Sequence, residues 1–311
     1  MQVRNPVGRW NPLAAVVWRM LERFIKGAGS EAVGSSAGLP IDLPSPDDSD
    51  GYTIFEGNPF PFRRLSVERS LEPAEEAESL AGAFRIRLAQ SRDSREQAGS
   101  LVKRRYASRG YQVQGIKTDA RLFTFVAFDV GTLVGTVSLR LDSPQGLAAD
   151  KLYKKEIDNL RRKRIQICEF TRLAVDPSVG SKRVLASLFH TAYLFAQRVR
   201  GREGAVIEVN PRHVVFYKRA LGFECIGPER LSPRVRAPAV LLYVPFEIIA
   251  EGLATYAGKP ELANSTHTLF PYGFSPKEEE GILGRLQALG PSASCGPLGD
   301  AKQNTTSCSA P

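Results

Sequence analysis

The chain has 311 residues, 42% of them hydrophobic, and a formal net charge of +9. This apolar content can form a core of ordinary size, but no segment approaches the roughly 20 consecutive apolar residues of a membrane span, which excludes an integral helical membrane protein. The positive charge favours an acidic partner: nucleic acid, an anionic membrane surface or an acidic protein. The four cysteines show no short pairing pattern, which is typical of a reducing cytosol.

The N-terminal part predicts one helix and a linker. Within residues 1–27, a short amphipathic helix is expected at 11–26, with Asn11 as its cap and Pro12 at its first position. This helix either lies on a membrane surface or packs against its own protein, and both interpretations remain open. Residues 28–79 begin with a stretch rich in Gly, Ser, Pro and Asp, and are predicted to be a flexible linker.

Residues 80–250 carry the periodic patterns of a folded domain. Strands are expected at 84–90, 122–128, 133–141, 165–175, 205–210, 223–227 and 239–246. Helices are expected at 91–110, 149–161, 181–199 and 213–221. Because a strand, a crossover helix and a strand follow one another from 165 to 210, they form a right-handed parallel unit. The predicted fold class is therefore α+β: a mixed sheet, antiparallel in its first half, with a βαβ parallel pair in its second half.

The C-terminal part, residues 251–311, becomes rich in Gly, Pro, Ser and Asn, and is predicted to be a largely disordered tail. The basic run RRKR at 161–164 is interpreted as a solvated face rather than a nucleic-acid site, because no nucleic-acid-binding motif accompanies it. The histidines show no metal-ligand spacing.

Three stretches could carry chemistry, and the first is the strand CEFTRLAV (168–175). With strict alternation, Glu169 shares a face with Leu173 and Val175, while Arg172 points the opposite way unless a bulge shifts the phase. A carboxylate on such an apolar strand is desolvated and its pKa rises, which suits either a general base or a buried ion pair.

The second stretch, VDPSVGSKRVL (175–185), is a loop that enters a helix. Free N–H groups around Gly180, together with Lys182 and Arg183, could hold a phosphate at the helix start. An ordinary strand-to-helix turn explains the same residues equally well.

The third stretch is EVNPRHVVFYKRALGF (208–223). His213 stands at a helix start, where the helix dipole keeps an imidazole neutral near pH 7. Tyr217 lies one turn later on the same helical face. Asn210 ends the preceding strand, at the carboxyl edge where α/β sheets usually bind ligands. The alternative is a capped helix whose tyrosine only packs in the core.

Together, RLAVDP (172–177), the helix that follows it and FYKRALGF (216–223) resemble the GCN5-related N-acyltransferase (GNAT) superfamily over residues 80–250. CEFTRLAV is similar to the Glu-x-x-Arg strand of acyl-homoserine lactone synthases. With HTAYLFA (190–196), VNPRHVVFY (209–217) and RAPAVLL (236–242), the chain resembles the long-chain N-acyl amino acid synthases most closely. The turn PSVGSKR has fewer glycines than the superfamily usually shows, which argues against ordinary acetyl-coenzyme A use.

This resemblance implies an acyltransferase with the acyl-CoA N-acyltransferase fold. It would move a long-chain fatty acyl group from an acyl carrier protein thioester to the amine of an amino acid. The acyl-phosphopantetheine thioester would be a co-substrate, delivered by carrier protein or coenzyme A, and no cofactor would be tightly bound. The protein would work in the cytoplasm, with peripheral contact at the inner membrane face through residues 11–26 and no nucleic-acid partner.

The resemblance also suggests roles for the residues of the three stretches. Either Glu169 or His213 would be the base, and Tyr217 the acid. Asn210 would position the pantetheine arm or the amine, and Arg172 would anchor the site or bind the amino acid carboxylate. The remaining candidates would hold the arm through the strand backbone or meet its phosphate: Leu173, Val175, Gly180, Lys182 and Arg183.

Two other hypotheses remain. One is another amine acyltransferase, of the lactone-synthase type or dependent on acyl-coenzyme A. The other is a non-catalytic acyl-binding module that has kept the fold.

Overall fold

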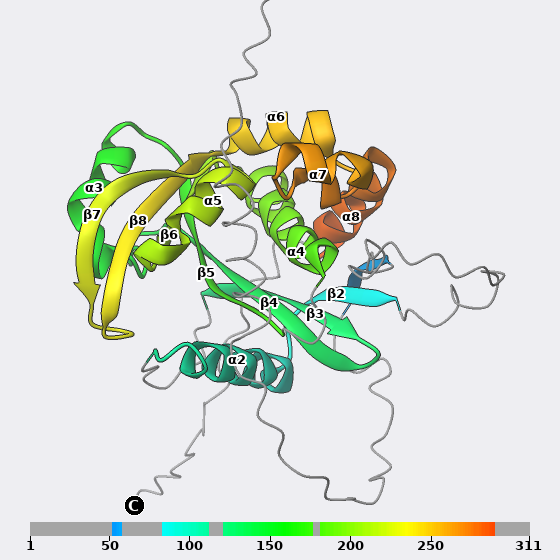
Figure 1. The fold of residues 1–311 in the computed structure, drawn as a ribbon, viewed down its shortest axis with the longest axis horizontal. Coiled ribbons are helices and arrows are strands. Elements are labelled where there is room, and N and C mark those ends of the chain that lie inside the picture. Colours follow the sequence, from blue (N-terminus) through cyan, green and yellow to red (C-terminus); the bar gives the residue numbers. More distant parts are fainter. Residues whose placement is uncertain (1–51, 58–82, 112–120, 177–180, 290–311) are drawn as a thin grey trace, which may run out of the picture.

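The computed structural model describes residues 52–57, 83–111, 121–176 and 181–289 (Figure 1). Its centre is an eight-stranded sheet with the order β1-β2-β3-β4-β5-β6-β8-β7. The strands are β1 Thr53–Gly57, β2 Phe84–Leu88, β3 Leu122–Asp129, β4 Thr132–Leu141, β5 Ile167–Val175, β6 Gly204–Val209, β7 Glu224–Ser232 and β8 Ala237–Pro245. Every ladder is antiparallel except β5–β6. The predicted mixed sheet with one parallel pair is confirmed.

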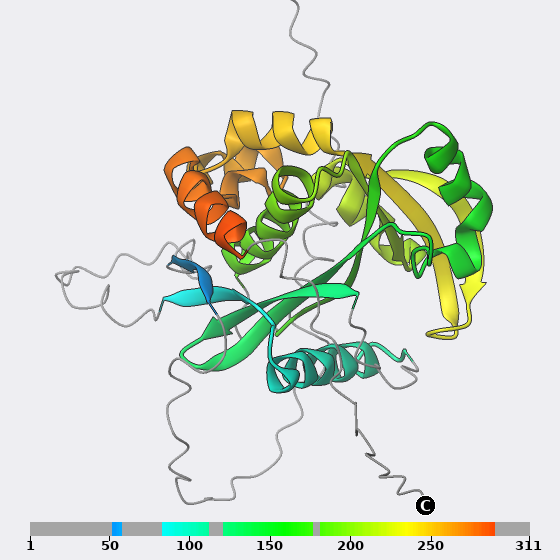
Figure 2. The same cartoon turned by 180° about the vertical axis from the view of Figure 1, so that it is seen from behind.

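Helices cover both faces of this sheet, as Figures 1 and 2 show from opposite sides. The α-helices are α2 Arg92–Ala107, α3 Asp150–Arg162, α4 Lys182–Leu194, α5 Val214–Leu221, α6 Phe246–Tyr256, α7 Ala263–Thr266 and α8 Pro276–Ala288. A π-helical turn, Phe195–Val199, extends α4, and 3-10 turns lie at Pro211–His213, Pro260–Leu262 and Phe270–Tyr272. No helix among the described residues is long and apolar enough to span a membrane.

The local sequence signals explain several helix ends. The Ser91 side chain accepts a hydrogen bond from the Ser94 N–H and so caps α2. Gly222 ends α5 in the left-handed conformation, with φ +77°, which costs glycine little because it has no Cβ. From the sequence, either Ser91 or Asp93 was expected to cap this helix, and Ser91 does so; Gly222 was the expected end of the later helix.

The parallel contact between β5 and β6 is short. It covers three residue pairs, Ile167↔Gly204, Cys168↔Ala205 and Glu169↔Val206. Beyond them β6 continues along β8 and β5 along β4, and no further β5–β6 pair occurs among the described residues. The two strands therefore part toward their carboxyl ends.

A bulge in β5 changes which side chains face the opening. Arg172 has φ +53°, and the ladder to β4 shifts register between Ser138↔Thr171 and Thr136↔Ala174. The β-bulge, which the sequence allowed but did not predict, is thus present. Because it shifts the phase, Phe170 and Val175 pack in the same core beneath α4. Strict alternation, which put Val175 and Leu173 on the face of Glu169, was wrong beyond Thr171.

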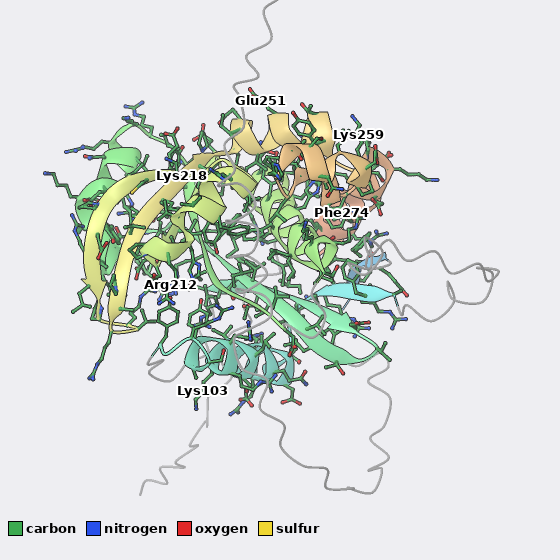
Figure 3. All side chains as sticks on the ribbon, in the orientation of Figure 1. Lys103, Arg212, Lys218, Glu251, Lys259 and Phe274 are labelled. Carbon is green, nitrogen blue, oxygen red and sulfur yellow. The ribbon has the colours of Figure 1, made fainter. Side chains whose placement is uncertain are left out.

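Residues 246–289, called the C-terminal module below, form α6 to α8 and pack over α4 (Figure 1). The Phe274 N–H donates to His190 Nδ1 at 3.0 Å, and Phe274 stacks on the imidazole at 4.8 Å; Figure 3 shows Phe274 between α4 and α8. With this cover, all thirteen residues of α4 are buried. The prediction of a largely disordered tail was wrong for residues 251–289, because these helices have a buried partner. Residues 290–311 lie outside the described residues.

The predicted linker also needs a correction. Residues 53–57 form the edge strand β1, which pairs with β2. Ile54 is fully buried, and its carbonyl accepts a hydrogen bond from Arg285 Nε of α8 at 2.6 Å. The strand thus depends on distant contacts that local composition does not show. The helix expected at 11–26 and the rest of the linker lie outside the described residues.

Candidate active site

A cavity of about 620 Å³ opens where β5 and β6 part. Its walls are the carboxyl-terminal halves of these strands, α2, the start of α4 and the polar turn before α5. This volume lies within the usual range for small-molecule and cofactor sites, roughly 300–1,000 Å³.

The cavity has two chemically different ends. Its buried wall is apolar, with Phe170, Val175, Leu185, Phe189, Ile207 and Tyr217. Its half-buried wall is cationic, with Arg105, Arg109, Arg172 and Arg234. We call this second part the cationic mouth. The arrangement suits a ligand with a long apolar part and an anionic head.

His213 lies on this wall, at the end of the 3-10 turn that precedes α5. Burial, with help from the positive charges of Arg212 and Arg109, lowers the pKa of the imidazole to about 4. The ring is therefore neutral near pH 7, as predicted. The helix dipole was the expected cause, whereas burial and the two arginines dominate in the structure.

Tyr217 both packs and lines the cavity. Its ring, 5% exposed, contacts Phe189 and Phe223 edge-on at 6.4 and 5.9 Å. Burial raises the pKa of the phenol, so the hydroxyl keeps its proton at neutral pH. The two interpretations that sequence left open, a core residue and a site residue, are compatible.

Asn210 lines the cavity, but its side chain is already hydrogen bonded to protein. Its amide nitrogen donates to the Pro238 carbonyl at 3.0 Å, which fixes the end of β6 to β8. Its amide oxygen accepts from the backbone N–H and Nε of Arg212, at 3.2 and 2.9 Å. Asn210 thereby holds Arg212, which Figure 3 labels; its guanidinium lies over the ring of Tyr111, a lining residue, at 5.4 Å.

Glu169 is placed elsewhere. It is 1% exposed and is not among the residues that line the cavity. Its carboxylate accepts hydrogen bonds from the backbone N–H groups of Ala148 and Ala149, at 2.6 and 3.4 Å. Burial raises the pKa of this carboxyl, although Arg234 acts in the opposite direction. Of the two predicted interpretations, the geometry favours a buried structural carboxylate.

The turn that faces Glu169 is itself fixed by charge. Arg161 forms ion pairs with Asp142 at 2.7 Å, Asp150 at 2.6 Å and Asp158 at 2.8 Å. Asp150 also accepts the Leu147 N–H at 2.7 Å. Arg161 belongs to the run RRKR, so its side chain is part of an ion-pair cluster rather than of a purely solvated face.

The candidate residues of β5 and those expected to bind a phosphate at the start of α4 lie in different places in the structure. Arg172, Leu173 and Val175 line the cavity together, because the bulge turns this part of β5 toward it. Lys182 and Arg183 are buried and are not among the lining residues.

Arg183 instead donates to three acceptors of the C-terminal module. These are the carbonyl oxygens of Tyr272 and Gly273, at 2.8 and 2.6 Å, and the Glu278 carboxylate at 2.7 Å. Lys182 lies over the Tyr272 ring at 5.4 Å. Their expected contact with a phosphate is therefore not part of the site that we propose, and Gly180 lies outside the described residues.

The structure adds residues that sequence reasoning missed. Glu208 lines the cavity and accepts hydrogen bonds from Ser232 Oγ at 2.7 Å and from Arg234. A signal was present, since an acidic side chain near the end of an apolar strand is unusual. Arg105 and Tyr106 come from α2, and Arg109 comes from the turn that follows it; the many basic residues of this segment hide which of them face the site.

Residues 97–245 match the family model described as N-acyl amino acid synthase FeeM. The structure of FeeM, an N-acyl amino acid synthase from uncultured soil microbes, is 26% identical, covers 56% of this chain and 95% of its own, and has a TM-score of 0.50. The predicted resemblance to the N-acyl amino acid synthases is confirmed, and so is the prediction of an acyltransferase. All residues that line the cavity of this acyltransferase, from Val102 to Ala239, fall within the matched region.

Two further solved structures are less similar to this chain. The acyl-homoserine lactone synthase LasI is 13% identical, covering 53% of this chain and 90% of its own, with a TM-score of 0.40. An N-acetyltransferase from Staphylococcus aureus Mu50 is 14% identical, covering 53% of this chain and 98% of its own, with a TM-score of 0.38. No curated protein matches the chain.

Proposed function

We propose that this N-acyltransferase is an N-acyl amino acid synthase that takes a long-chain acyl group from an acyl carrier protein. One observation carries the proposal: a single cavity joins a buried apolar wall to a cationic mouth where β5 and β6 part. The apolar wall suits a fatty acyl chain, whereas an acetyl group would leave this part of the cavity largely empty. The family match supports the same class of reaction.

The acyl donor would enter along the parted strands. A pantetheine arm carries two amides, and the backbone of β5 at Leu173 and Val175 is no longer paired with β6, so the arm can add to it as a strand would. Arg105 and Arg109 line the cavity and Arg212 lies over the ring of Tyr111, another lining residue, and these positive charges would attract an acidic carrier protein.

The amino acid would bind beside the thioester. Arg172 or Arg234 can hold its carboxylate in a bidentate pair, and Glu208 can accept a hydrogen bond from its ammonium group. These side chains lie on the same lining as His213, so the amine would be delivered to a neutral imidazole.

The ammonium group first loses one proton to solvent, which leaves an amine with a free lone pair. The amine nitrogen then attacks the thioester carbonyl carbon, and His213, directly or through water, accepts the second proton that this nitrogen releases. The C–S bond then breaks, the amide forms, and the thiolate takes a proton from the Tyr217 hydroxyl, which burial keeps protonated. Tyr217 recovers its proton from the imidazolium through solvent, so the charges balance.

The test uses purified full-length protein, acyl carrier protein charged with palmitate, and a mixture of amino acids. Thiol release and mass spectrometry would follow the two products. We expect Tyr217→Phe and His213→Gln to lower kcat by about 10²–10⁴-fold. Tyr243→Phe and His267→Gln are matched controls, because neither residue lines the cavity.

Parallel reactions with palmitoyl-coenzyme A would identify the donor. Carrier protein as the better donor supports the proposal, whereas equal or better use of coenzyme A would replace it by an acyl-coenzyme A-dependent enzyme. Bound acyl donor without any transfer would favour the acyl-binding module.

A further inference from the structure

A second, smaller cavity lies behind the buried end of the first. Its volume is about 20 Å³, and it shares two lining residues with the first cavity, Phe170 and Phe189. Its far wall comes from the C-terminal module, with Ile249, Leu253 and Phe270. The module lies outside the matched region, which ends at 245.

The two shared phenylalanines separate the cavities. Each is 5% exposed, and their ring centroids lie 6.3 Å apart. Phe189 also touches the ring of Tyr217, and Phe170 lies 6.3 Å from the ring of Phe246 in the module. A continuous row of rings therefore runs from the site to the C-terminal module.

The chemistry of the smaller cavity restricts its occupant. Its lining is almost wholly apolar, and the Nδ1 of His190, a polar atom beside it, already accepts the Phe274 N–H. A space of this size could hold one water molecule, but water needs polar partners and apolar cavities stay dry. The end of a hydrocarbon chain is the group that fits such a wall.

We propose that the Phe170–Phe189 pair closes the distal end of the acyl-chain site and sets the longest chain accepted, and that the smaller cavity behind the pair is the space that a longer chain enters once one ring is replaced. The inference rests on the proposed function. It makes the C-terminal module part of substrate selection: with both rings in place the chain stops at them, and with a smaller side chain there it continues toward α6.

The test replaces Phe189 by Leu and measures kcat/KM with carrier protein charged with chains from octanoyl to stearoyl. We expect the preference to move to longer chains, by about fourfold for each methylene newly accommodated. Ala186 lines only the smaller cavity, so Ala186→Val in the Phe189→Leu background should cancel the shift. Phe170→Leu is the second variant should Phe189→Leu unfold, as thermal unfolding would show.

An unchanged chain-length profile in a folded, active variant would overturn the inference, and so would a shift that Ala186→Val does not cancel. The proposed function fails separately, if the parent enzyme transfers no chain of any length. In that case the inference is tested by measuring how strongly free fatty acids of the same chain lengths stabilise the parent and the Phe189→Leu variant. A longer optimum for the variant supports the inference, and the same optimum as the parent refutes it.

Discussion

The position of Arg183 gives a prediction that separates a structural role from a phosphate-binding one. Its side chain, 5% exposed, donates to two backbone carbonyl groups and to Glu278, and lies over the rings of Phe55 and Phe274. It therefore joins α4 and β1 to the C-terminal module. Arg183→Met keeps the length of the side chain and removes every donor.

The expected cost follows from the groups left behind. Hydrogen bonds that involve a charged group contribute about 1.5–3 kcal/mol each. The Glu278 side chain is 35% exposed, so water can solvate its carboxylate and the ion pair contributes less than a fully buried one. The two carbonyls carry the larger part, and we expect the free energy of unfolding to fall by about 3–5 kcal/mol.

Glu278→Gln is the matched partner variant. Glu278 accepts from Arg183 with one carboxylate oxygen and from Ser275 with the other. Glutamine has a single acceptor oxygen and can keep only one of these contacts, so we expect a loss of about 1 kcal/mol, smaller than that of Arg183→Met. Urea unfolding with a constant m-value measures both changes. An Arg183→Met variant as stable as the parent but with a raised KM for the acyl donor would refute this reasoning and restore the phosphate role.

Two further predictions concern buried titratable groups. Glu169→Gln should retain activity, because Glu169 does not line the cavity, and its amide oxygen can accept the same N–H groups. Because burial raises the pKa of Glu169 in the folded state above the ordinary 4.5, the stability that this carboxyl contributes is present below pH 4.5 and is lost as the pH rises through the folded pKa. Urea unfolding at a series of pH values should show this loss for the parent and not for Glu169→Gln. A loss of activity as large as that of Tyr217→Phe would contradict the structural role of Glu169. Burial lowers the pKa of His190, so its contribution is present above about pH 6.5 and lost as pH falls, with a slope of up to about 1.4 kcal/mol per pH unit. His190→Gln should flatten this slope, and an unchanged slope would show that another group titrates.

The sequence predicted those elements whose signals are local. The cap at Ser91 and the stop at Gly222 follow from side-chain and backbone preferences that act within one turn. The parallel pair followed from chain order alone. The sequence could not predict the left-handed conformation of Arg172, because a non-glycine residue adopts positive φ rarely and for reasons of long-range packing.

For the candidate site too, residues located by local signals were predicted, and residues placed by distant partners were not. His213, Tyr217 and Arg172 line one cavity because they stand near strand and helix ends, which sequence can locate. Glu169 and Arg183 were misplaced because their partners, Ala148 and Glu278, are distant in the chain. The C-terminal module was predicted to be disordered because of its Gly and Pro content. The sequence Ser275-Pro276-Lys277-Glu278 nevertheless carries the signature of a capping box.

The complete burial of α4 has a practical consequence for the limits of the folding unit. Part of that burial depends on residues beyond 245, where the family match ends. A fragment cut at 250, the predicted boundary, would expose Phe189, His190 and Tyr193 to water and leave Arg183 without its acceptors. The catalytic region and its C-terminal helices thus share one hydrophobic core, and the shortest stretch that can fold as an enzyme extends to the end of α8.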